Sequence, residues 1–519
     1  MKRIAVTLLA VLLLMQGCGV KEDYSSELEI EAPAALAVFA EAPESPVYPL
    51  AAESTSLSVI YPAAAEEVTE GTKHFVDVFV KETGITLQMH PLPYGEYLSD
   101  INVILSGEDV PDLIYDAPGY LMDTDQMDVL LPLDDLIAEY APNYIQTAGN
   151  CYDGLQALIE DNGHIMRMYQ FYEEPQFIPY LGVAIRQDWM EELGIDPPET
   201  YDDYHDLLLA MKNQYGCKLP FRMLPAGITG ADNFTSGFGV SVGAHTASNG
   251  FYQVDGVVKY GLLEAGFEDY ITTMRKWYDE GLITVAYRDN VDLGSNSYLI
   301  DLSTGDSGVF FLPLESFDLL AGMCGFPIIA GMDPVTETGA VSHLAPSRAT
   351  SIAGAGVSIT ELCKNPELAV QAADWFYSDA ATITGNYGTE GKTYTLQDGT
   401  PEYTELALSN LKNMTADLQG IVSVEREAVF LSDYKPILDV WTRQKDTDDM
   451  LPELYFGKKV QDAYETLMLD INSYGDGCVA QLISGDMPIS EIPAMRERLK
   501  ELHIEEALAI WQKALDNYR

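Results

Sequence analysis

Leu57-Ser58-Val59-Ile60-Tyr61 and Ile85-Thr86-Leu87-Gln88-Met89 are two β-like runs that flank a helical stretch through Phe75, Val78 and Phe79. Gly84 stands where that helix should end, directly before the second run. A strand, a helix and a strand within about 35 residues form the βαβ unit of a parallel sheet. This stretch therefore predicts an α/β fold.

The same alternation continues along the chain. Pro111-Asp112 leads into another short, buried strand, Leu113-Ile114-Tyr115. Thr200 and Asp203 have the spacing of a capping box at the start of a helix. Asn365-Pro366-Glu367 supplies a cap, a first-turn proline and a favourable charge for a later helix. We expect Trp189, Trp277 and Trp375, which lie on apolar helical faces, to be core residues.

The N-terminus has the layout of an export signal. Two basic residues precede a short apolar stretch, residues 4–15, which is followed by Gln16-Gly17-Cys18. A spanning helix needs about 20 apolar residues, so residues 1–17 are predicted to be a cleaved signal peptide. Cys18 would then be the lipidated first residue of a bacterial lipoprotein. The alternative is an ordinary secreted protein with an incidental cysteine.

Residues 18–55 are rich in Ala, Pro, Glu and Ser. This composition predicts a lipid anchor followed by a flexible, acidic tether that reaches roughly 30 to 35 Å. The folded part should then begin near residue 56.

The charge of the chain excludes some partners. It carries 29 basic and 81 acidic residues, a formal net charge of −52. Nucleic-acid binding needs Lys and Arg clusters that release counterions, so we expect no nucleic acid. An anionic membrane surface would also repel the chain, and membrane contact is expected through the lipid alone. The acidity itself is interpreted as a source of solubility.

No cofactor, metal or catalytic group is predicted. Residues 386–393 resemble a phosphate-binding loop, but Asn386 occupies the place of its first glycine. Asp123-Thr124-Asp125 begins like a calcium loop, but Asp128 occupies the turn position that requires glycine. The hydrolase and metalloprotease motifs are absent from the sequence, and carboxylates are too abundant for a pair of them to indicate a glycosidase. Five cysteines beyond Cys18 lack metal or redox spacing, and we expect buried thiols: Cys151, Cys217, Cys324, Cys363 and Cys478.

Three groups of residues, in order, resemble the bacterial extracellular solute-binding proteins of family 1. These are the maltose-binding-like subunits of ABC importers, including their Gram-positive lipoprotein branch. The first group contains Pro111-Asp112-Leu113-Ile114-Tyr115. The second contains Asp188-Trp189-Met190-Glu191-Glu192-Leu193-Gly194-Ile195, and the third Asn386-Tyr387-Gly388-Thr389-Glu390-Gly391. Sequence similar to the family covers nearly the whole chain after the tether.

The resemblance implies a periplasmic-binding-protein-like fold: two α/β lobes, hinge crossovers, and a ligand cleft between the lobes. Closure around a ligand would let a permease distinguish loaded from empty protein. We expect the chain to cross near 180–184, 354–356 and 396–401. Lobe 1 would comprise 56–184 and 356–396, and lobe 2 would comprise 185–355 and 397–519.

The resemblance also implies which loops face the ligand. Aromatic faces and carboxylates suit a sugar, because rings stack on its C–H surfaces and oxygens bracket its hydroxyls. Asp116 could instead cap its loop, and Arg186 could instead form a surface salt bridge. Glu315 stands near the place where the family presents an aromatic. The candidate ligand-binding residues are Tyr115, Asp116, Tyr120, Tyr169, Phe171, Arg186, Glu315 and Phe317.

The function implied is that of a monomeric, lipid-anchored substrate-binding subunit on the outer face of the cytoplasmic membrane. It would capture a carbohydrate or oligosaccharide and deliver it to separate ABC permease subunits, without catalysis. Alternatives are a binding protein for a peptide or another polar solute, a sensor domain that serves a membrane kinase, and a surface-anchored glycoside hydrolase.

Overall fold

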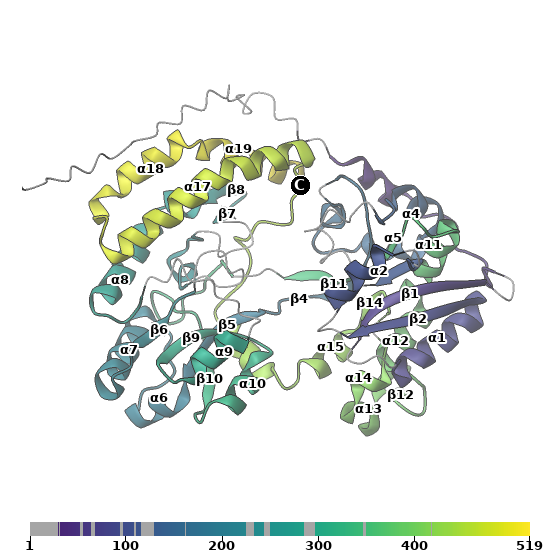
Figure 1. Cartoon of the computed structure of the whole chain (residues 1–519), viewed down its shortest axis with the longest axis horizontal. Helices are drawn as coiled ribbons and strands as arrows, with labels where there is room; N and C mark the ends of the chain where they lie inside the picture. The colour runs from purple at the N-terminus through teal and green to yellow at the C-terminus, as the bar shows by residue number, and fades with distance from the viewer. Residues whose placement is uncertain are drawn as a thin grey trace, which may run out of the picture.

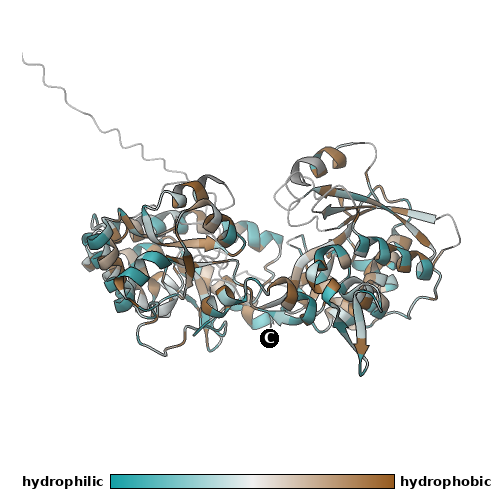
Figure 2. Cartoon of the chain, turned by 90° about the horizontal axis from the view of Figure 1, so that it is seen from below, coloured by the Kyte–Doolittle hydropathy of each residue, from teal (hydrophilic) through white to brown (hydrophobic). Residues whose placement is uncertain are grey.

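The computed structural model describes residues 30, 32–51, 55–63, 68–93, 97–107, 110–115, 129–160, 162–224, 233–242, 250–284, 296–345, 349–416 and 418–518. They form two α/β lobes that lie side by side (Figure 1). Seen from below, the lobes stand apart and are joined along one side (Figure 2). The predicted two-lobe α/β architecture is confirmed.

Lobe 1 is built on a six-stranded sheet with the strand order β14-β4-β11-β3-β1-β2. The predicted βαβ unit is present as β1 (Thr55–Ala63), α1 (Glu70–Thr83) and β2 (Ile85–Pro93), and β1 pairs with β2 in parallel. Gly84 ends α1 in the left-handed conformation, with φ of 74°, which glycine adopts without strain.

The other elements of lobe 1 come from two parts of the chain. The first part contributes η2 (Ala34–Ala40), α2 (Tyr97–Leu105), β3 (Leu113–Tyr115), α4 (Asp134–Tyr140), α5 (Pro142–Ala148), η4 (Leu155–Leu158) and β4 (Met168–Gln176). The second part contributes β11 (Thr350–Ile359), α11 (Pro366–Asp374), η8 (Trp375–Tyr377), α12 (Asp379–Tyr387), β12 (Tyr394–Gln397), β13 (Thr400–Tyr403), α13 (Glu405–Ser409), α14 (Leu411–Met414), β14 (Ile421–Val422) and α15 (Val424–Phe430).

Lobe 2 is built on a four-stranded sheet with the order β10-β5-β9-β6. Its elements up to the return crossing are β5 (Leu181–Arg186), α6 (Gln187–Leu193), α7 (Tyr201–Tyr215), β6 (Leu219–Arg222), η5 (Ser236–Phe238), β7 (Phe251–Val254), β8 (Val257–Tyr260), η7 (Gly261–Leu263), α8 (Gly266–Asp279), α9 (Asn296–Ser303), β9 (Ser307–Pro313), α10 (Ser316–Met323) and β10 (Ile328–Gly331). The capping box of Thr200 and Asp203 starts α7 as predicted.

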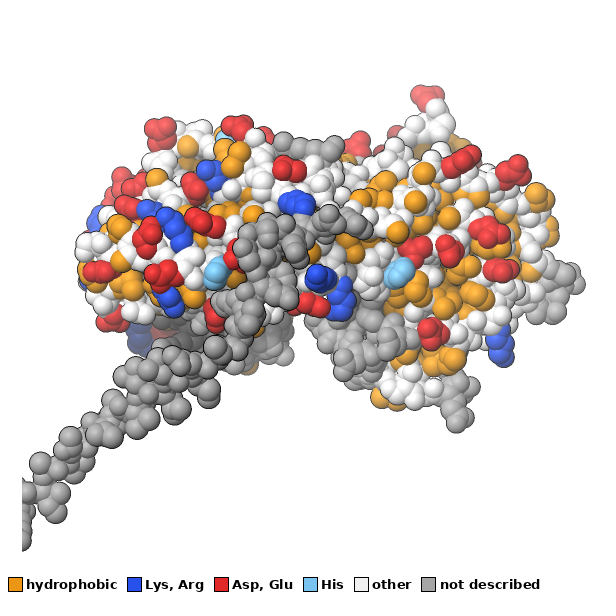
Figure 3. Space-filling model, turned by 90° about the horizontal axis from the view of Figure 1, so that it is seen from above, with side chains coloured by type: hydrophobic (Ala, Val, Ile, Leu, Met, Phe, Trp, Pro, Cys, Tyr) orange, Lys and Arg blue, Asp and Glu red, His pale blue; other side chains and the backbone are white. Residues whose placement is uncertain are grey.

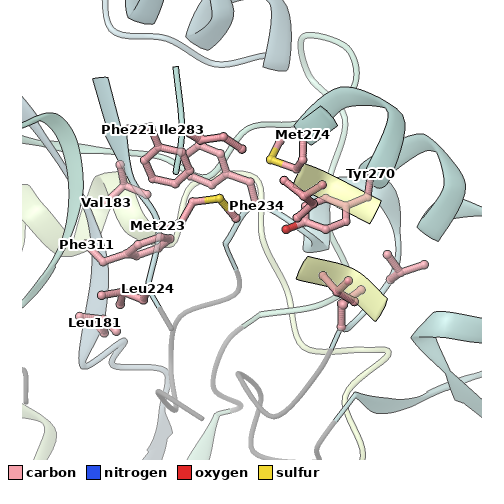
Figure 4. Close-up of a cluster of buried hydrophobic side chains, with 14 of the residues drawn as sticks. Leu181, Val183, Phe221, Met223, Leu224, Phe234, Tyr270, Met274, Ile283 and Phe311 are labelled. Carbon is pink, nitrogen blue, oxygen red and sulfur yellow. The ribbon is translucent and has the colours of Figure 1, made fainter. Parts of the chain in front are cut away.

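The core of lobe 2 lies between its sheet and its helices. Phe221, Phe234 and Phe311 pack together there, with ring centroids 4.5 Å apart for the first pair (Figure 4). The C-terminal elements α16 (Lys435–Trp441), α17 (Lys458–Ser484), η9 (Ile489–Glu491), α18 (Ile492–Glu501) and α19 (Ile504–Tyr518) also belong to this lobe. Trp277 and Trp375 are buried as predicted, whereas Trp189 is half-buried and stacks on Tyr215.

The crossings differ from the predicted positions. β4 belongs to lobe 1 and β5 to lobe 2, so the first crossing is at 177–180. Residues 354–356 lie inside β11, which pairs with β4 in lobe 1, so the return comes earlier than predicted. The third crossing at 396–401 was wrong: β14 pairs with β4, and α15 contacts β4, so the chain returns to lobe 2 only between α15 and α16.

The predicted tether is wrong for residues 32–51, which we call the N-terminal strap. Ala35 and Val38 are buried in the apolar core of lobe 1, and the backbone N–H of Leu50 donates to the carbonyl of Thr83 at 2.8 Å. Ile30, before the strap, is buried in the core of lobe 2 instead. Burial of these apolar side chains stabilises the strap against lobe 1, even though the segment is rich in Ala and Pro. The predicted signal peptide and Cys18 lie outside the described residues.

The sequence predicts an acidic surface and buried thiols. Acidic side chains are spread over both lobes in the view from above (Figure 3). The five cysteines after Cys18 are free, and four of them are buried. Across the described residues, we find no helix with the length and apolarity required to cross a bilayer.

Candidate functional site: the region between the lobes

The strands of lobe 1 bring several chain segments to one edge of its sheet. β1 pairs in parallel with both β2 and β3, so these three strands end at the same edge. Their last residues are Ala63, Pro93 and Tyr115. In α/β sheets, ligands bind beyond the carboxyl ends of parallel strands. The position of Tyr115 at a strand end is therefore as expected for a ligand-binding loop.

Hydrogen bonds fix the side chain of Tyr115. Its hydroxyl accepts from Nε2 of Gln170 at 2.8 Å, and the same Nε2 donates to the carbonyl of Gln419 at 2.8 Å. Three distant segments are thereby held together around the end of β3. Asp116 and Tyr120, which follow Tyr115 in the predicted site, lie outside the described residues.

Five of the predicted ligand-binding residues are buried inside the lobes, and Tyr115, which is 4% exposed, belongs to the apolar core of lobe 1. The hydroxyl of Tyr169 donates to Oε1 of Glu160 at 2.9 Å, and burial raises the pKa of Tyr169. Phe171 packs between Tyr144 and Tyr377. The structure assigns both aromatic residues to the core of lobe 1.

Arg186 and Phe317 are held in lobe 2 in the same way. The guanidinium of Arg186 pairs with Asp188 and lies over the rings of Trp189 and Phe326, at 4.0 and 3.7 Å. Its forked donors are therefore already engaged. Phe317 is buried edge-on against Trp441, with ring centroids 5.6 Å apart.

Glu315 remains on the surface of lobe 2, just before α10. Tyr434 lies near it, in the connection between α15 and α16. The pKa of Tyr434 is raised by burial and then by the negative charges of Asp318 and Glu315. The segment between α15 and α16, where the chain returns to lobe 2, thus places Tyr434 beside two carboxylates. This combination suits a polyhydroxylated ligand.

A second group of tyrosines and carboxylates lies around α15, beside the crossing. The hydroxyl of Tyr387 donates to Oε2 of Glu425 at 2.7 Å. Burial, followed by the charge of Glu427, raises the pKa of Tyr172 to about 12. Burial also raises the pKa of the Glu427 carboxyl, against the opposing effect of Arg426. Sequence reasoning missed this group, although Ser423, which caps α15, marks the start of a helix.

The hinge strands contain a local irregularity. The pairing of β11 with β4 shifts register between Ile352 and Gly356. Gly354 lies within this bulge with φ of 85°, and its carbonyl accepts from Nη1 of Arg167 at 3.4 Å. A Cβ on Gly356 would lie 2.8 Å from the carbonyl oxygen of Met168. Both positions therefore require glycine, the first for its backbone conformation and the second for close strand approach.

One exposed group of side chains could hold a cation. Ligand atoms of His343, Asp446 and Asp448 lie within 4.8 Å of one another on the surface of lobe 2. The hydrogen bond with Asp446 raises the pKa of His343. Surface acids commonly gather in this way without a metal function.

The chain is similar to known proteins along most of its length. A model of the family described as bacterial extracellular solute-binding protein matches residues 52–383. FusA of Streptococcus pneumoniae, described as a fructooligosaccharide ABC transporter substrate-binding protein, is 24% identical over 75% of this chain and 70% of its own. Lipoprotein LipO of Bacillus subtilis is 20% identical over 73% of this chain and 76% of its own.

Solved structures show the same fold. FusA in complex with kestose has a TM-score of 0.60 at 19% identity, covering 89% of this chain and 99% of that one. A solute-binding protein of Bifidobacterium longum infantis, described as binding HMO, also has a TM-score of 0.60, at 17% identity and with the same coverage.

Proposed function

The chain belongs to the bacterial extracellular solute-binding proteins, and from this we propose that it captures a carbohydrate or oligosaccharide between its two lobes and delivers it to the membrane permease of an ABC importer. We infer the ligand class from the similarity to FusA, which covers 75% of this chain. Lobes joined by hinge strands can close on a ligand, and closure can be recognised by a permease.

The residues around the crossings support a sugar. Tyr172 and Tyr434 are half-buried aromatic residues, and Glu427 and Glu315 lie near them. Glu425, which accepts from the hydroxyl of the buried Tyr387, supplies a further carboxylate. We propose that these groups, together with Asp116 and Tyr120 in the loop after Tyr115, contact the ligand. We propose binding without catalysis, so the sugar should be recovered intact after incubation with the protein.

A thermal-shift screen tests the ligand class. Kestose, nystose and other oligosaccharides are compared with short peptides, which represent the alternative ligand class. A ligand at about 100 times its Kd adds roughly 2.7 kcal/mol of stability, so a binding sugar should raise Tm clearly. A shift produced by peptides and by none of the sugars would contradict the proposal.

The variant Asp116→Ala localises the binding. A carboxylate that accepts from sugar hydroxyls contributes about 1.5 to 3 kcal/mol per bond, so affinity should fall about tenfold or more while folding barely changes. If Asp116 only caps its loop, calorimetry would instead show unchanged affinity and a stability loss of about 1 kcal/mol.

We also propose that the protein is a monomer anchored through a lipid on Cys18 to the outer face of the cytoplasmic membrane. The signal layout before Cys18 supports this location, and a relative is described as a lipoprotein. In cells labelled with a radioactive fatty acid, Cys18→Ala should incorporate no label and should keep residues 1–17. A labelled, processed variant would show that another residue carries the lipid.

A further inference from the structure

The end of α19 contacts lobe 1, although the helix belongs to lobe 2. The hydroxyl of Tyr518, the last residue of the helix, donates to the backbone carbonyl of Asp153 at 3.0 Å. The ring also lies against the next residue, because a Cβ added to Gly154 would be 2.9 Å from it. One side chain thus connects the last helix of lobe 2 with the turn before η4 in lobe 1.

This turn of lobe 1 is bonded directly to the hinge strand β11. The carboxylate of Asp153 accepts from the backbone N–H of Ser351 at 2.7 Å and from its hydroxyl at 3.0 Å. The backbone N–H of Tyr152 donates to the same hydroxyl oxygen at 2.9 Å. Ser351 is the second residue of β11, where the chain has just returned to lobe 1. Tyr518 therefore contacts a part of lobe 1 that is fixed to a hinge strand.

A second tyrosine of the C-terminal part makes a similar contact. Between α16 and α17, Leu454 and Phe456 pack in the apolar core of lobe 2, whereas Tyr455 packs against the core of lobe 1. A Cβ added to Gly163 would lie 3.0 Å from the hydroxyl oxygen of Tyr455. Two tyrosines thus reach the segment 153–163, which precedes β4. We call their contacts with this segment the joint contacts.

The end of α19 lies on the side where the lobes are joined. In the view from below, the lobes stand apart on one side, and the C-terminus lies on the other (Figure 2). The chain also passes from lobe 2 to lobe 1 here. Ile30, whose carbonyl accepts from Asn517, belongs to the core of lobe 2, and Ala35 belongs to the core of lobe 1.

The joint contacts are made in the arrangement seen here, and lobe closure would break them. Closure rotates the lobes about their hinge strands, so the open side narrows and groups on the joined side move apart. A hydrogen bond is lost once its two atoms are more than about 3.5 Å apart. A cavity of about 340 Å³ lies beside the contact, lined by Tyr152 of lobe 1 and by Gln253, Leu515 and Tyr518 of lobe 2. The joint is therefore not filled with side chains, and the lobes can rotate there.

We propose that the joint contacts stabilise the open arrangement of the lobes and thereby weaken the binding of the captured ligand. This role depends on the proposed function, because it concerns closure around a sugar. A contact that exists only in the open form lowers the population of the closed form, and the apparent Kd rises by the same factor. Loss of the contact therefore tightens binding without any change in the groups that touch the ligand.

The variants Tyr518→Phe and Tyr518→Ala test this role. Tyr518 is half-buried at the end of its helix, and the Phe variant removes only the hydrogen bond to Asp153. We expect Tyr518→Phe to bind kestose about two- to tenfold more tightly than the parent in titration calorimetry. Tyr518→Ala, which also removes the ring from Gly154, should show the larger change.

Tyr215→Phe is the matched control. Tyr215 is also half-buried and is the last residue of α7, but its hydroxyl donates to Oε2 of Glu192 within lobe 2, at 3.0 Å. The control loses a hydrogen bond of the same kind inside one lobe. Its affinity for kestose should equal that of the parent.

Small-angle scattering of the full chain without ligand gives a second readout that needs no sugar. The double variant Tyr455→Ala/Tyr518→Ala should have a smaller radius of gyration than the parent and than Tyr215→Phe. If the parent bound none of the oligosaccharides, the proposed ligand class would be wrong, and the scattering would still decide the role of the joint contacts. An equal radius of gyration in the double variant and the parent, or unchanged or weaker kestose binding by Tyr518→Ala, would overturn the proposal.

Discussion

Replacing Trp375 with Ala is expected to lower the free energy of unfolding of lobe 1 by about 3 to 5 kcal/mol. Trp375 is fully buried, and its ring contacts Phe75 and Phe79 edge-on, with centroids 5.3 and 5.2 Å away. Its Nε1 donates to Oε2 of Glu82 at 2.8 Å. The substitution removes a large aromatic group and leaves a cavity that α1 cannot fill. Denaturant unfolding of the two proteins measures the loss.

Trp375→Phe is the matched control for this substitution. It removes the hydrogen bond to Glu82 and only a small part of the ring volume, so we expect a loss of about 1 to 2 kcal/mol. If the Ala and Phe variants were equally stable, the aromatic cluster of Phe75, Phe79 and Trp375 would not be the packed centre of lobe 1.

Stability is expected to fall as pH rises from about 4 to about 7, because of Asp374. This carboxyl group is fully buried and accepts from the backbone N–H of Tyr144 and from Nδ2 of Asn143, each at 2.8 Å. Burial raises its pKa to about 7. An unfolded chain releases the same proton near pH 4, so the folded state binds it more tightly within this window. The stabilisation is complete below about pH 4 and is lost above about pH 7, with a span of up to about 4 kcal/mol.

The variant Asp374→Asn isolates this contribution. Asn has a similar shape and does not titrate, so the plot of Tm against pH should become flatter between pH 4 and 7. It should keep a smaller slope from Asp476, whose pKa burial raises to about 6. Asp379→Asn, an exposed change nearby in the chain, should leave the slope as it is in the parent. An unaltered slope in Asp374→Asn would show that Asp374 titrates normally in the folded protein.

Local patterns predicted the regular elements well. The βαβ unit, the capping box before α7, and the proline and cap of α11 depend on residues a few positions apart, and all are present. The docking of the strap and the third crossing were not predictable in this way. β14 is only two residues long, and its place in lobe 1 depends on pairing with Phe171 and Tyr172, some 250 positions earlier.

The ligand-binding residues could be predicted only in part, because their burial and hydrogen-bond partners depend on the tertiary structure. Tyr115 lies at a strand end as expected, because strand order follows from the βαβ pattern. Tyr169 lies in the core because Glu160 accepts its hydroxyl bond, a partner that only the tertiary structure identifies. The ion pair of Arg186 was predictable from the sequence, because Asp188 stands two positions later and accepts from the guanidinium.

Asn517 donates from Nδ2 to the carbonyl of Ile30 at 2.8 Å, a contact between positions 487 apart. Ile30 is buried in the same apolar core as Ala514 and Leu515 of α19. A polypeptide made and exported with its N-terminus first presents Ile30 long before these partners have been synthesised. Contacts this distant form only after the intervening chain has been brought together. Final closure of the lobe 2 core must therefore wait for the last helix to leave the ribosome and cross the membrane.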